Sequence, residues 1–400
     1  MRITSIETIR VAEFANLVWV RLTTDEGLTG IGETYFGPDA TEAHIHGVVA
    51  PYLLGKDPRD INTHTDYMLG YLGRTGSSAE QRGRSATDIA LWDLLGKSLG
   101  VPLYQLFGGK VRDRLPIYNT CANMNYNTKP AASHSTFDYG TGQGPARFDD
   151  TDAFLKRPVE LAGSLLDMGI TGMKIWPFDF LGSDVVDGNI STAGLRKGVA
   201  AFREIRKAYG DKIDLMCEMH AFWNLPSARR IIEALAEFEP SWVEDPVPLD
   251  QMSSLAALQA STPVLIGTGE TLGGIGAYKS LIDAKGCGLV IYDVSWSGGI
   301  GNARKVAAMA EAAHLPVALH DCTGPVVLAA STHLALATRN CFTQEIARAY
   351  YFTWYRDLVT DLPPVENGTI TVSGKPGLGL ELSPDLFKRE DVKVKCSILE

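Results

Sequence analysis

The sequence lacks the features of a secreted, disulfide-bonded or membrane-spanning protein. Its six cysteines include no C-x-x-C pair, which fits a reducing compartment better than a disulfide framework. No apolar run approaches the length of about 18 residues that a transmembrane helix needs, and the first 25 residues contain no apolar signal-peptide core. We therefore expect a cytoplasmic protein.

Positive charge is also scarce. The 37 lysines and arginines are outnumbered by 47 aspartates and glutamates, so the formal net charge is −10 and the pI is near 5.4. This balance argues against nucleic acid or an anionic membrane as the main partner. We expect a small-molecule partner instead.

Apolar residues, by contrast, make up 45% of the 400 positions, enough for one large core and a smaller one. Residues 1–36 alternate in the manner of an antiparallel meander. Helical patterns follow, and in the clearest of them Ser85 and Asp88 stand at capping-box spacing while Gly100 ends the helix. We expect a separate α+β domain over residues 1–113.

Residues 114–349 have a different pattern, in which short apolar runs alternate with amphipathic segments. Eight such runs over about 235 residues match the usual length of a (β/α) barrel. A doubly wound open sheet would gather its polar strand ends at one switch point, whereas almost every run here ends in a polar residue. We expect a barrel, with residues 350–400 folded back onto the first domain. The predicted strands are 115–121, 172–176, 213–219, 241–244, 263–270, 289–293, 316–320 and 342–346.

One stretch interrupts this rhythm. Residues 122–150 show no periodicity and are rich in Gly, Asn, Thr and Asp. A loop this long in a compact domain is usually functional or disordered. Because it leaves the end of the first predicted barrel strand, we expect a lid over the site; a plain insertion is the alternative.

Three glutamates close successive strand-like runs at equal intervals of 26 residues: Glu218, Glu244 and Glu270. A strand, a crossover helix and two loops need about this length, so three neighbouring parallel strands would each carry a carboxylate at the same height. The carboxyl ends of the strands are where a barrel keeps its chemistry. Three converging carboxylates need a cation to stay ionised together, and the spacing therefore predicts a metal site.

Other polar residues stand at the same ends of the predicted strands. Residues two apart on a strand face the same side, so His220 should point into the barrel mouth with Glu218, and Trp176 with Lys174. The last three strands contribute one polar residue each, namely Asp293, His320 and Glu345. An arbitrary barrel would not repeat a polar group in every unit.

These motifs resemble the mandelate racemase/muconate lactonizing enzyme branch of the enolase superfamily over nearly the whole chain. The matching segments are E-M-H at 218–220, V-E-D-P at 243–246, G-T-G-E at 267–270 and the dyad of Asp293 and His320. The Gly-Gly-Ile after the sixth strand and the His-Asp-Cys-Thr-Gly-Pro segment are most like the galactonate-dehydratase-type sugar-acid dehydratases of that branch.

The resemblance implies a modified (β/α)7β TIM barrel under an N-terminal α+β capping domain. It also implies Mg²⁺ as the cofactor, held by Glu218, Glu244 and Glu270, and a homo-oligomer, either a dimer or an octamer. Two departures stand out. The first metal ligand of the family is most often aspartate, whereas this chain has Glu218. Racemases of the branch carry Lys-x-Lys on the second strand, whereas this chain has Lys174 followed two residues later by Trp176, which disfavours two-base racemisation.

The chemistry expected from these groups is β-elimination of water. Removal of an α-proton beside a carboxylate leaves an ene-diolate, whose charge a divalent ion stabilises. We expect His320, oriented by Asp293, to be the base, and His220 to protonate the departing β-hydroxyl. Glu345 would bond substrate oxygens, and Lys174 would neutralise the substrate carboxylate. The predicted function is Mg²⁺-dependent dehydration of an aldonic or aldaric sugar acid to a 2-keto-3-deoxy acid.

Three alternatives stay open. The same base and metal would serve a cycloisomerase or an epimerase acting on a lactone, a sugar acid or a proline derivative. Lys174 could instead form a Schiff base in an aldolase barrel. A barrel used only for binding would be expected to have a damaged metal set, whereas this chain keeps its three carboxylates.

Polar residues outside the ring suit a polyhydroxylated acid as the small-molecule substrate. Those in the capping domain are Asn16, Glu33 and Tyr35, and those at the predicted lid are Asn119, Asn123 and Asn125. Trp176 either faces the substrate or plugs the barrel mouth.

Overall fold

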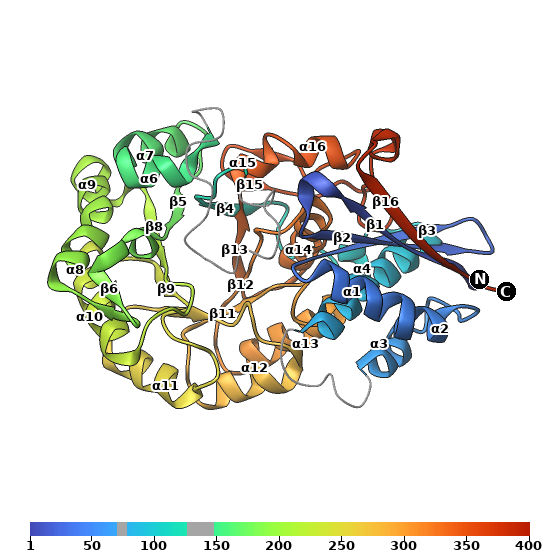
Figure 1. The fold of residues 1–400 in the computed structure, drawn as a ribbon, viewed down its shortest axis with the longest axis horizontal. Coiled ribbons are helices and arrows are strands. Elements are labelled where there is room, and N and C mark those ends of the chain that lie inside the picture. Colours follow the sequence, from blue (N-terminus) through green and yellow to red (C-terminus); the bar gives the residue numbers. More distant parts are fainter. Residues whose placement is uncertain (70–77, 126–147) are drawn as a thin grey trace.

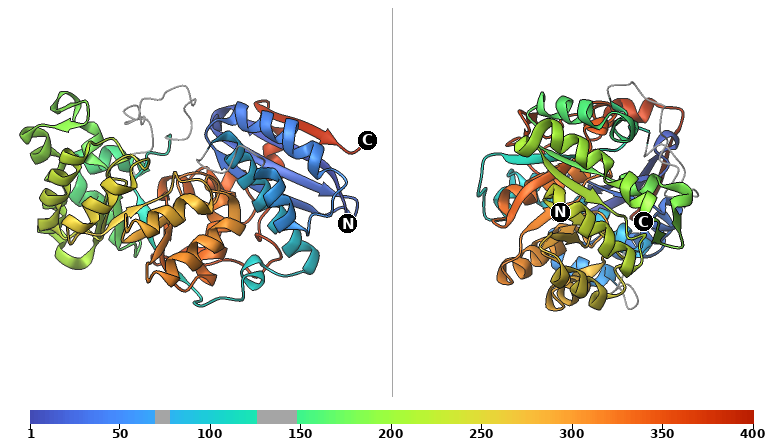
Figure 2. Two further views of the ribbon diagram at one scale, coloured as in Figure 1. Left: turned by 90° about the horizontal axis from the view of Figure 1, so that it is seen from below. Right: turned by 90° about the vertical axis from the view of Figure 1, so that its left-hand side faces the viewer.

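The computed structural model describes residues 1–69, 78–125 and 148–400. A barrel of strands and helices lies beside a smaller layer of sheet and helices, and both chain termini belong to the smaller layer (Figure 1, Figure 2). Within the described ranges, no helix is long and apolar enough to cross a membrane.

In the described part of the chain, eight parallel strands close into the barrel, because β13 pairs with β4 as well as with β12. All eight lie where the sequence predicts strands, so the expected α/β barrel is confirmed. Their apolar residues are almost all buried, as parallel strands covered by helices require. The strands are β4 (Leu115–Thr120), β5 (Gly172–Ile175), β8 (Asp214–Glu218), β9 (Trp242–Glu244), β10 (Ile266–Thr268), β11 (Leu289–Tyr292), β12 (Val317–Leu319) and β13 (Cys341–Ile346).

Helices follow every barrel strand except the last and form the outer ring. After β13 the described chain has only two one-turn helices before it leaves the barrel, α15 (Arg348–Tyr351) and α16 (Tyr355–Leu358), which gives the (β/α)7β pattern. A small hairpin, β6 (Val185–Val186) with β7 (Asn189–Ile190), precedes α8. The ring helices are α6 (Asp150–Lys156), α7 (Pro158–Leu166), α8 (Thr192–Gly198), α9 (Ala200–Tyr209), α10 (Leu225–Leu235), α11 (Met252–Ser261), α12 (Gly274–Asp283), α13 (Gly299–Ala312) and α14 (Pro325–Ala337).

The inside of the barrel is filled by side chains. Tyr118 and Trp242 meet edge to face with ring centroids 5.1 Å apart. They belong to a buried cluster with Met216, Leu289, Ile291 and Ala318. The interior is therefore a packed core, and polar groups can gather only above it, at the carboxyl ends of the strands.

The capping layer is built from both ends of the chain. Its antiparallel sheet has the order β16-β1-β2-β3, so the last strand pairs with the first. A hairpin of β14 (Val365–Glu366) and β15 (Thr369–Ile370) joins the C-terminal segment to β4 as well. The division between domains at residue 113 stays a prediction. The remaining elements are β1 (Ile3–Val11), β2 (Leu17–Thr24), β3 (Thr29–Tyr35), β16 (Val392–Ile398), α1 (Pro38–His44), α2 (Ala50–Leu53), α3 (Ile61–Leu69), α4 (Ala79–Leu99) and α5 (Leu103–Leu106).

The capping box expected at Ser85 and Asp88 is wrong, because both residues lie inside α4, which starts at Ala79. The end of that helix at Gly100 agrees with the structure. Ser85 Oγ accepts a hydrogen bond from Gly298 N (2.9 Å), and Asp88 Oδ2 accepts one from Gly301 N (3.2 Å). These two polar residues therefore join the capping helix to the barrel and do not start a helix.

Candidate active site

The three evenly spaced glutamates meet at the carboxyl ends of neighbouring strands. Glu218 and Glu244 are the last residues of β8 and β9 and are register partners, and Glu270 follows β10. One carboxylate oxygen from each lies within 4.8 Å of the others. All three residues are at most 8% exposed. The three glutamates that are evenly spaced in the sequence therefore form a single cluster of carboxylates in the structure.

This cluster fits a divalent cation. Burial raises the pKa of Glu244 and of Glu270, so the ionised forms need a compensating positive charge. Glu270 Oε2 has no hydrogen-bond partner among the described residues, and its ion pair with His320 Nε2 is long, at 3.6 Å. Carboxylate oxygens are the ligands that Mg²⁺ prefers. The donor set therefore suits a hard cation at Glu218, Glu244 and Glu270.

Lys174, on β5, is the cation that the chain itself supplies. Its Nζ lies 2.6 Å from Glu244 and 3.2 Å from Glu218, and 2.8 Å from Glu345 of β13. Burial would lower the pKa of this amine, but the carboxylates of Glu244 and Glu345 raise it well above its usual value. The structure thus brings Lys174 and Glu345 to the cluster, with the lysine held as a protonated counter-ion.

Asp293 and His320 form a pair just beyond β11 and β12. Asp293 Oδ2 lies 2.7 Å from His320 Nδ1, and its Oδ1 accepts hydrogen bonds from the backbone N and Oγ of Ser295 and from Trp296 N. With Nδ1 engaged, the other ring nitrogen of His320 faces Glu270. Burial would lower the pKa of His320, but Glu270 and Asp293 raise it well above its usual value.

His220 forms a second pair, with a partner that the sequence reasoning missed. His220 Nδ1 lies 2.6 Å from Asp179 Oδ2, and Asp179 lies in a short 3-10 helix (Pro177–Phe180) that follows β5. Burial opposes a charged ring, but Asp179 and Glu218 raise the pKa of His220 to about 9. The sequence around Asp179 resembles that of an ordinary loop. Its position shortly after a predicted barrel strand is the only signal that could have indicated its pairing with His220.

The position of His220 does not result from the alternation of side chains along a strand. The strand ends at Glu218, and His220 has a left-handed backbone with φ of 46°. The turn brings its backbone N–H back to Glu218 Oε1, 2.9 Å away. Trp176 also lies beyond its strand, buried, with its ring edge-on to His220 at 5.8 Å between centroids. Both residues reach the rim of the site, but through loop geometry and not through the pleat of a strand.

The predicted substrate contacts from β4 lie elsewhere. Tyr118 points into the barrel, so its neighbour Asn119 points outward. There Asn119 Nδ2 donates to Asp150 Oδ2 (3.0 Å), and Asn119 Oδ1 accepts from Arg348 N (2.8 Å). Asn123 donates to Asp149 Oδ1 at 2.6 Å. The structure does not bring either side chain to the carboxylate cluster. The predicted lid falls mainly on residues 126–147, which lie outside the described residues.

The predicted contacts of the capping layer are buried. Asn16 Nδ2 lies 3.4 Å from the Tyr35 hydroxyl. Glu33 is fully buried and accepts hydrogen bonds from Trp19 Nε1 (2.6 Å) and Val327 N (3.0 Å). Because Val327 lies in the first turn of α14, Glu33 caps a barrel helix. Its hydrogen bonds thus join the capping sheet to a barrel helix.

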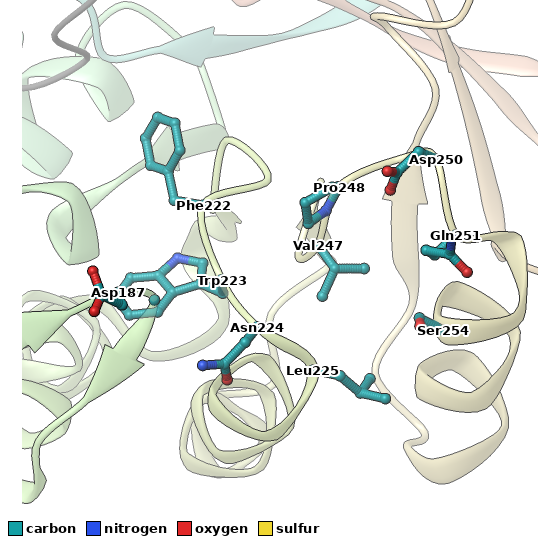
Figure 3. Close-up of a pocket in the computed structure, with 11 residues that line it drawn as sticks. Asp187, Phe222, Trp223, Asn224, Leu225, Val247, Pro248, Asp250, Gln251 and Ser254 are labelled. Atoms are coloured by element: carbon teal, nitrogen blue, oxygen red, sulfur yellow. The ribbon is translucent and has the colours of Figure 1, made fainter.

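A pocket of about 330 Å³ is lined mainly by residues that follow β8 and β9 in the chain, and none of the three glutamates lines it (Figure 3). Phe222 and Trp223, from the loop that carries His220, form one wall, and Val247, Pro248 and Asp250 form the opposite one. The sequence reasoning did not anticipate this pocket.

Comparisons with known proteins agree with this geometry. Residues 157–386 match the family described as enolase C-terminal domain-like, and residues 3–108 match the mandelate racemase / muconate lactonizing enzyme N-terminal domain. The chain belongs to the mandelate racemase branch of the enolase superfamily. Membership of this branch implies a small-molecule carboxylate substrate, and the barrel with its capping domain is the architecture of the superfamily.

Individual relatives extend over the full chain. A D-galactonate dehydratase of Xanthomonas campestris pv. campestris is 31% identical over 398 residues, covering 97% of this chain and 94% of the relative. An enolase of the mandelate racemase subgroup from Agrobacterium tumefaciens is 45% identical with a TM-score of 0.88, covering 100% of this chain and 99% of the other. An enolase protein from Sargasso Sea environmental sequencing is 38% identical, with a TM-score of 0.88 and the same coverage. The family and the named dehydratases together make this chain an enzyme of the lyase class.

Proposed function

We propose that the chain is a Mg²⁺-dependent dehydratase of a sugar acid, aldonic or aldaric. One observation carries the proposal: a histidine paired with a buried aspartate stands on each side of the carboxylate cluster. His320 contacts Glu270 at one end of the row of strands β8, β9 and β10, and the backbone of His220 contacts Glu218 at the other. Elimination of water needs a base and an acid on one substrate, and these two groups supply both.

The metal would be held by Glu218, Glu244 and Glu270, and when bound it would stabilise the negative charge that develops on the substrate carboxylate. Lys174 adds a fixed positive charge beside the same carboxylates. A net charge closer to neutral at this point would allow an anionic substrate to approach.

The proton transfers belong to the two histidines. His320 would take the α-proton at Nε2 in its neutral form, which a cation held by Glu270 would favour because it would offset the carboxylate that raises the pKa of the ring. Asp293 keeps the proton on Nδ1 and so fixes the orientation of the ring. His220, charged and held by Asp179, protonates the departing β-hydroxyl. Loss of water gives an enol, which becomes the 2-keto-3-deoxy acid.

The alternative reactions use these groups less fully. Two-base racemisation needs a second base near the end of β5, where this chain has Trp176. A Schiff-base aldolase needs a neutral lysine amine, but three carboxylates contact the Lys174 ammonium. A cycloisomerase or epimerase would use His320 and the metal and would leave the His220–Asp179 pair without a task. It is the second candidate.

A substrate screen tests the proposal. Aldonic and aldaric acids, with D-galactonate first because of the relatives, are incubated with the chain and Mg²⁺, and 2-keto-3-deoxy products are measured. We expect one or a few related acids to be dehydrated, and chelation to stop the reaction. If no acid in this library gave a 2-keto-3-deoxy product, and a lactone or a proline derivative were turned over instead, the proposal would be contradicted. A homo-oligomer also stays a prediction, which light scattering of the purified chain would check.

A further inference from the structure

We propose that Trp296 positions the ring of His320, and that Arg82 of the capping domain holds Trp296 in place. The inference rests on the proposed function in taking His320 as the base. It goes beyond that function because it makes the capping domain part of the support of the catalytic base, in addition to any role in enclosing the substrate.

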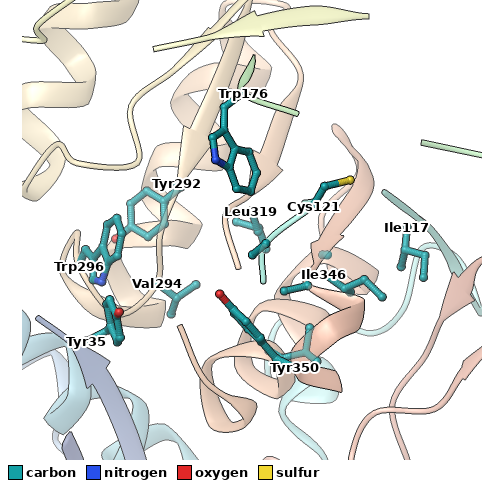
Figure 4. Packing of buried hydrophobic residues seen from close by; sticks show 14 of the residues in the cluster. Tyr35, Ile117, Cys121, Trp176, Tyr292, Val294, Trp296, Leu319, Ile346 and Tyr350 are labelled. Atoms are coloured by element: carbon teal, nitrogen blue, oxygen red, sulfur yellow. The ribbon is translucent and has the colours of Figure 1, made fainter. Parts of the chain in front are cut away.

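The first observation is a row of three groups in contact: His320, Trp296 and Arg82. The Trp296 ring lies against His320, with centroids 4.8 Å apart and planes tilted by 43°. The Arg82 guanidinium lies 4.7 Å from the centroid of the Trp296 ring. Arg82 is itself anchored through Nη1, which donates to the backbone oxygen of Tyr35 at 2.5 Å. Figure 4 shows Trp296 beside Tyr35, where the barrel meets the capping sheet.

The second observation is that hydrogen bonds tie the segment after β11 to the capping domain. Thr34 Oγ1, on β3, donates to Ser295 O at 2.9 Å. Gln81 Nε2, on α4, donates to Ser297 O at 3.0 Å, and Ser85 Oγ accepts from Gly298 N at 2.9 Å. The same segment holds Asp293 Oδ1 through its own backbone, so the capping domain constrains the partner of His320 as well.

Two glycines make this contact possible. A Cβ at Gly298 would lie 2.8 Å from Gln81 Nε2, and one at Gly299 would lie 2.3 Å from Asp88 Oδ2. Both glycines have positive φ, at 119° and 81°. The Gly-Gly-Ile sequence therefore serves the close approach of α13 to the capping helix, as well as the turn after the strand.

The consequence concerns the alignment of the base. Asp293 fixes one edge of the His320 imidazole, but this hydrogen bond alone leaves the ring free to tilt about the line from Nδ1 to Asp293 Oδ2. Trp296 packs at a tilt against the His320 ring and restricts that rotation, and Arg82 adds a cation–π contact that orders Trp296. A small misplacement of a catalytic group costs about 10²-fold in rate, so this support should be visible in the chemical step.

A first experiment needs no substrate. The full chain is labelled with ¹³C-histidine, and the ring signals of His320 are assigned by their loss in His320→Asn. The ring current of Trp296 should shift the His320 signals, so Trp296→Leu should move them more than those of any other histidine, and Trp296→Phe less. Trp354→Leu is the matched control, because Trp354 is equally buried and contacts Phe14 of the capping domain without touching the dyad. Unmoved His320 signals in folded Trp296→Leu would overturn the inference.

A second experiment uses the dehydrated acid found by the screen. Trp296→Leu should lower kcat about 10- to 100-fold with KM nearly unchanged, and should raise the kinetic isotope effect for α-deuterated substrate, because proton abstraction becomes slower. Trp296→Phe should recover most of the rate. Arg82→Met should lose about 3- to 10-fold, and Arg82→Lys, which keeps the cation, should lose less.

These outcomes distinguish a failure of the inference about Trp296 from a failure of the proposed function. An unchanged isotope effect, or an equal loss of kcat in Trp354→Leu, would show a general packing role and overturn the inference. If no sugar acid is turned over, the proposed function fails. The His320 signals in Arg82→Met, which keeps both rings, then decide whether the contact of Arg82 with Trp296 positions His320: a shift supports the inference, and unmoved signals overturn it. If Trp296→Leu does not fold, Trp296→Phe and Arg82→Met carry the same tests.

Discussion

The two histidine–aspartate pairs of the site have the same hydrogen bond but different surroundings. His320 and Asp293 are 2.7 Å apart, and His220 and Asp179 are 2.6 Å apart. The side chain of His320 is 7% exposed and covered by Trp296, whereas that of His220 is 23% exposed and stands on a left-handed turn. The first pair is built into the ends of two strands, and the second into two loops.

This difference suits the two roles proposed for the pairs. A base that removes an α-proton must be aligned to a carbon atom, and a rigid strand end with a packed ring provides that alignment. An acid that protonates a departing hydroxyl must reach an oxygen that moves away, and a partly exposed loop residue can follow it.

Removing a metal ligand should disable both pairs at once. We expect Glu244→Gln to lose Mg²⁺ binding and dehydration together, because Glu244 lies at the centre of the cluster and also contacts Lys174. Titration calorimetry with Mg²⁺ and a product assay measure the two losses. Glu233→Gln, on the exposed face of α10, is the control and should change neither. Full activity of Glu244→Gln would disprove the metal site.

Removing only the base should separate chemistry from metal binding. We expect His320→Asn to lower turnover by about 10³-fold or more while Mg²⁺ binds as before. His314→Asn, at an exposed position, serves as the control. Near-normal turnover of His320→Asn would reject the base assignment and make Lys174 the next candidate.

Weakening the second pair should cost less than removing a histidine. In Asp179→Asn the ring of His220 loses the carboxylate that helps keep it charged, so we expect dehydration to fall about 10²-fold. The loss should be greatest at high pH, because the pKa of His220 falls and the acid form becomes scarcer. A pH–rate profile of the variant identical in shape to that of the parent chain would contradict this role.

A histidine without an aspartate should act on stability instead. His333 is fully buried between Tyr104 N and Leu378 O, and burial lowers its pKa to about 4. Between about pH 6.5 and 4 the unfolded chain binds a proton that the folded chain excludes, so the free energy of unfolding should fall by about 3 kcal/mol as the pH drops through this window. Denaturant titrations should show this slope in the parent chain and a shallower one in His333→Gln.

The sequence predicts those parts of the molecule that follow strand periodicity. The eight barrel strands coincide with apolar runs, and the three clustered glutamates, Asp293 and His320 stand at the ends of such runs, which parallel pairing brings together. Contacts made by loops or across domains leave no comparable pattern. Asp179 is one loop residue among many, and the capping-box spacing of Ser85 and Asp88 was a coincidence inside a longer helix.

At Asn119 the residue type and the position on the strand point to different conclusions. Its residue type suited a sugar hydroxyl, but its position on β4 turns it away from the site, next to the inward-facing Tyr118. The alternation that placed the glutamates correctly, if applied to this strand, would have excluded Asn119 from the site.

Exchange of the α-proton with solvent tests the division of labour between the two histidines most directly. His220→Gln is incubated in D₂O with Mg²⁺ and the dehydrated acid, and deuterium at the α-carbon is followed beside the 2-keto-3-deoxy product. We expect this variant to exchange the α-proton while product formation falls by about 10²-fold, and we expect His320→Asn to lose both the exchange and the product formation. Exchange lost in His220→Gln but kept in His320→Asn would contradict the account.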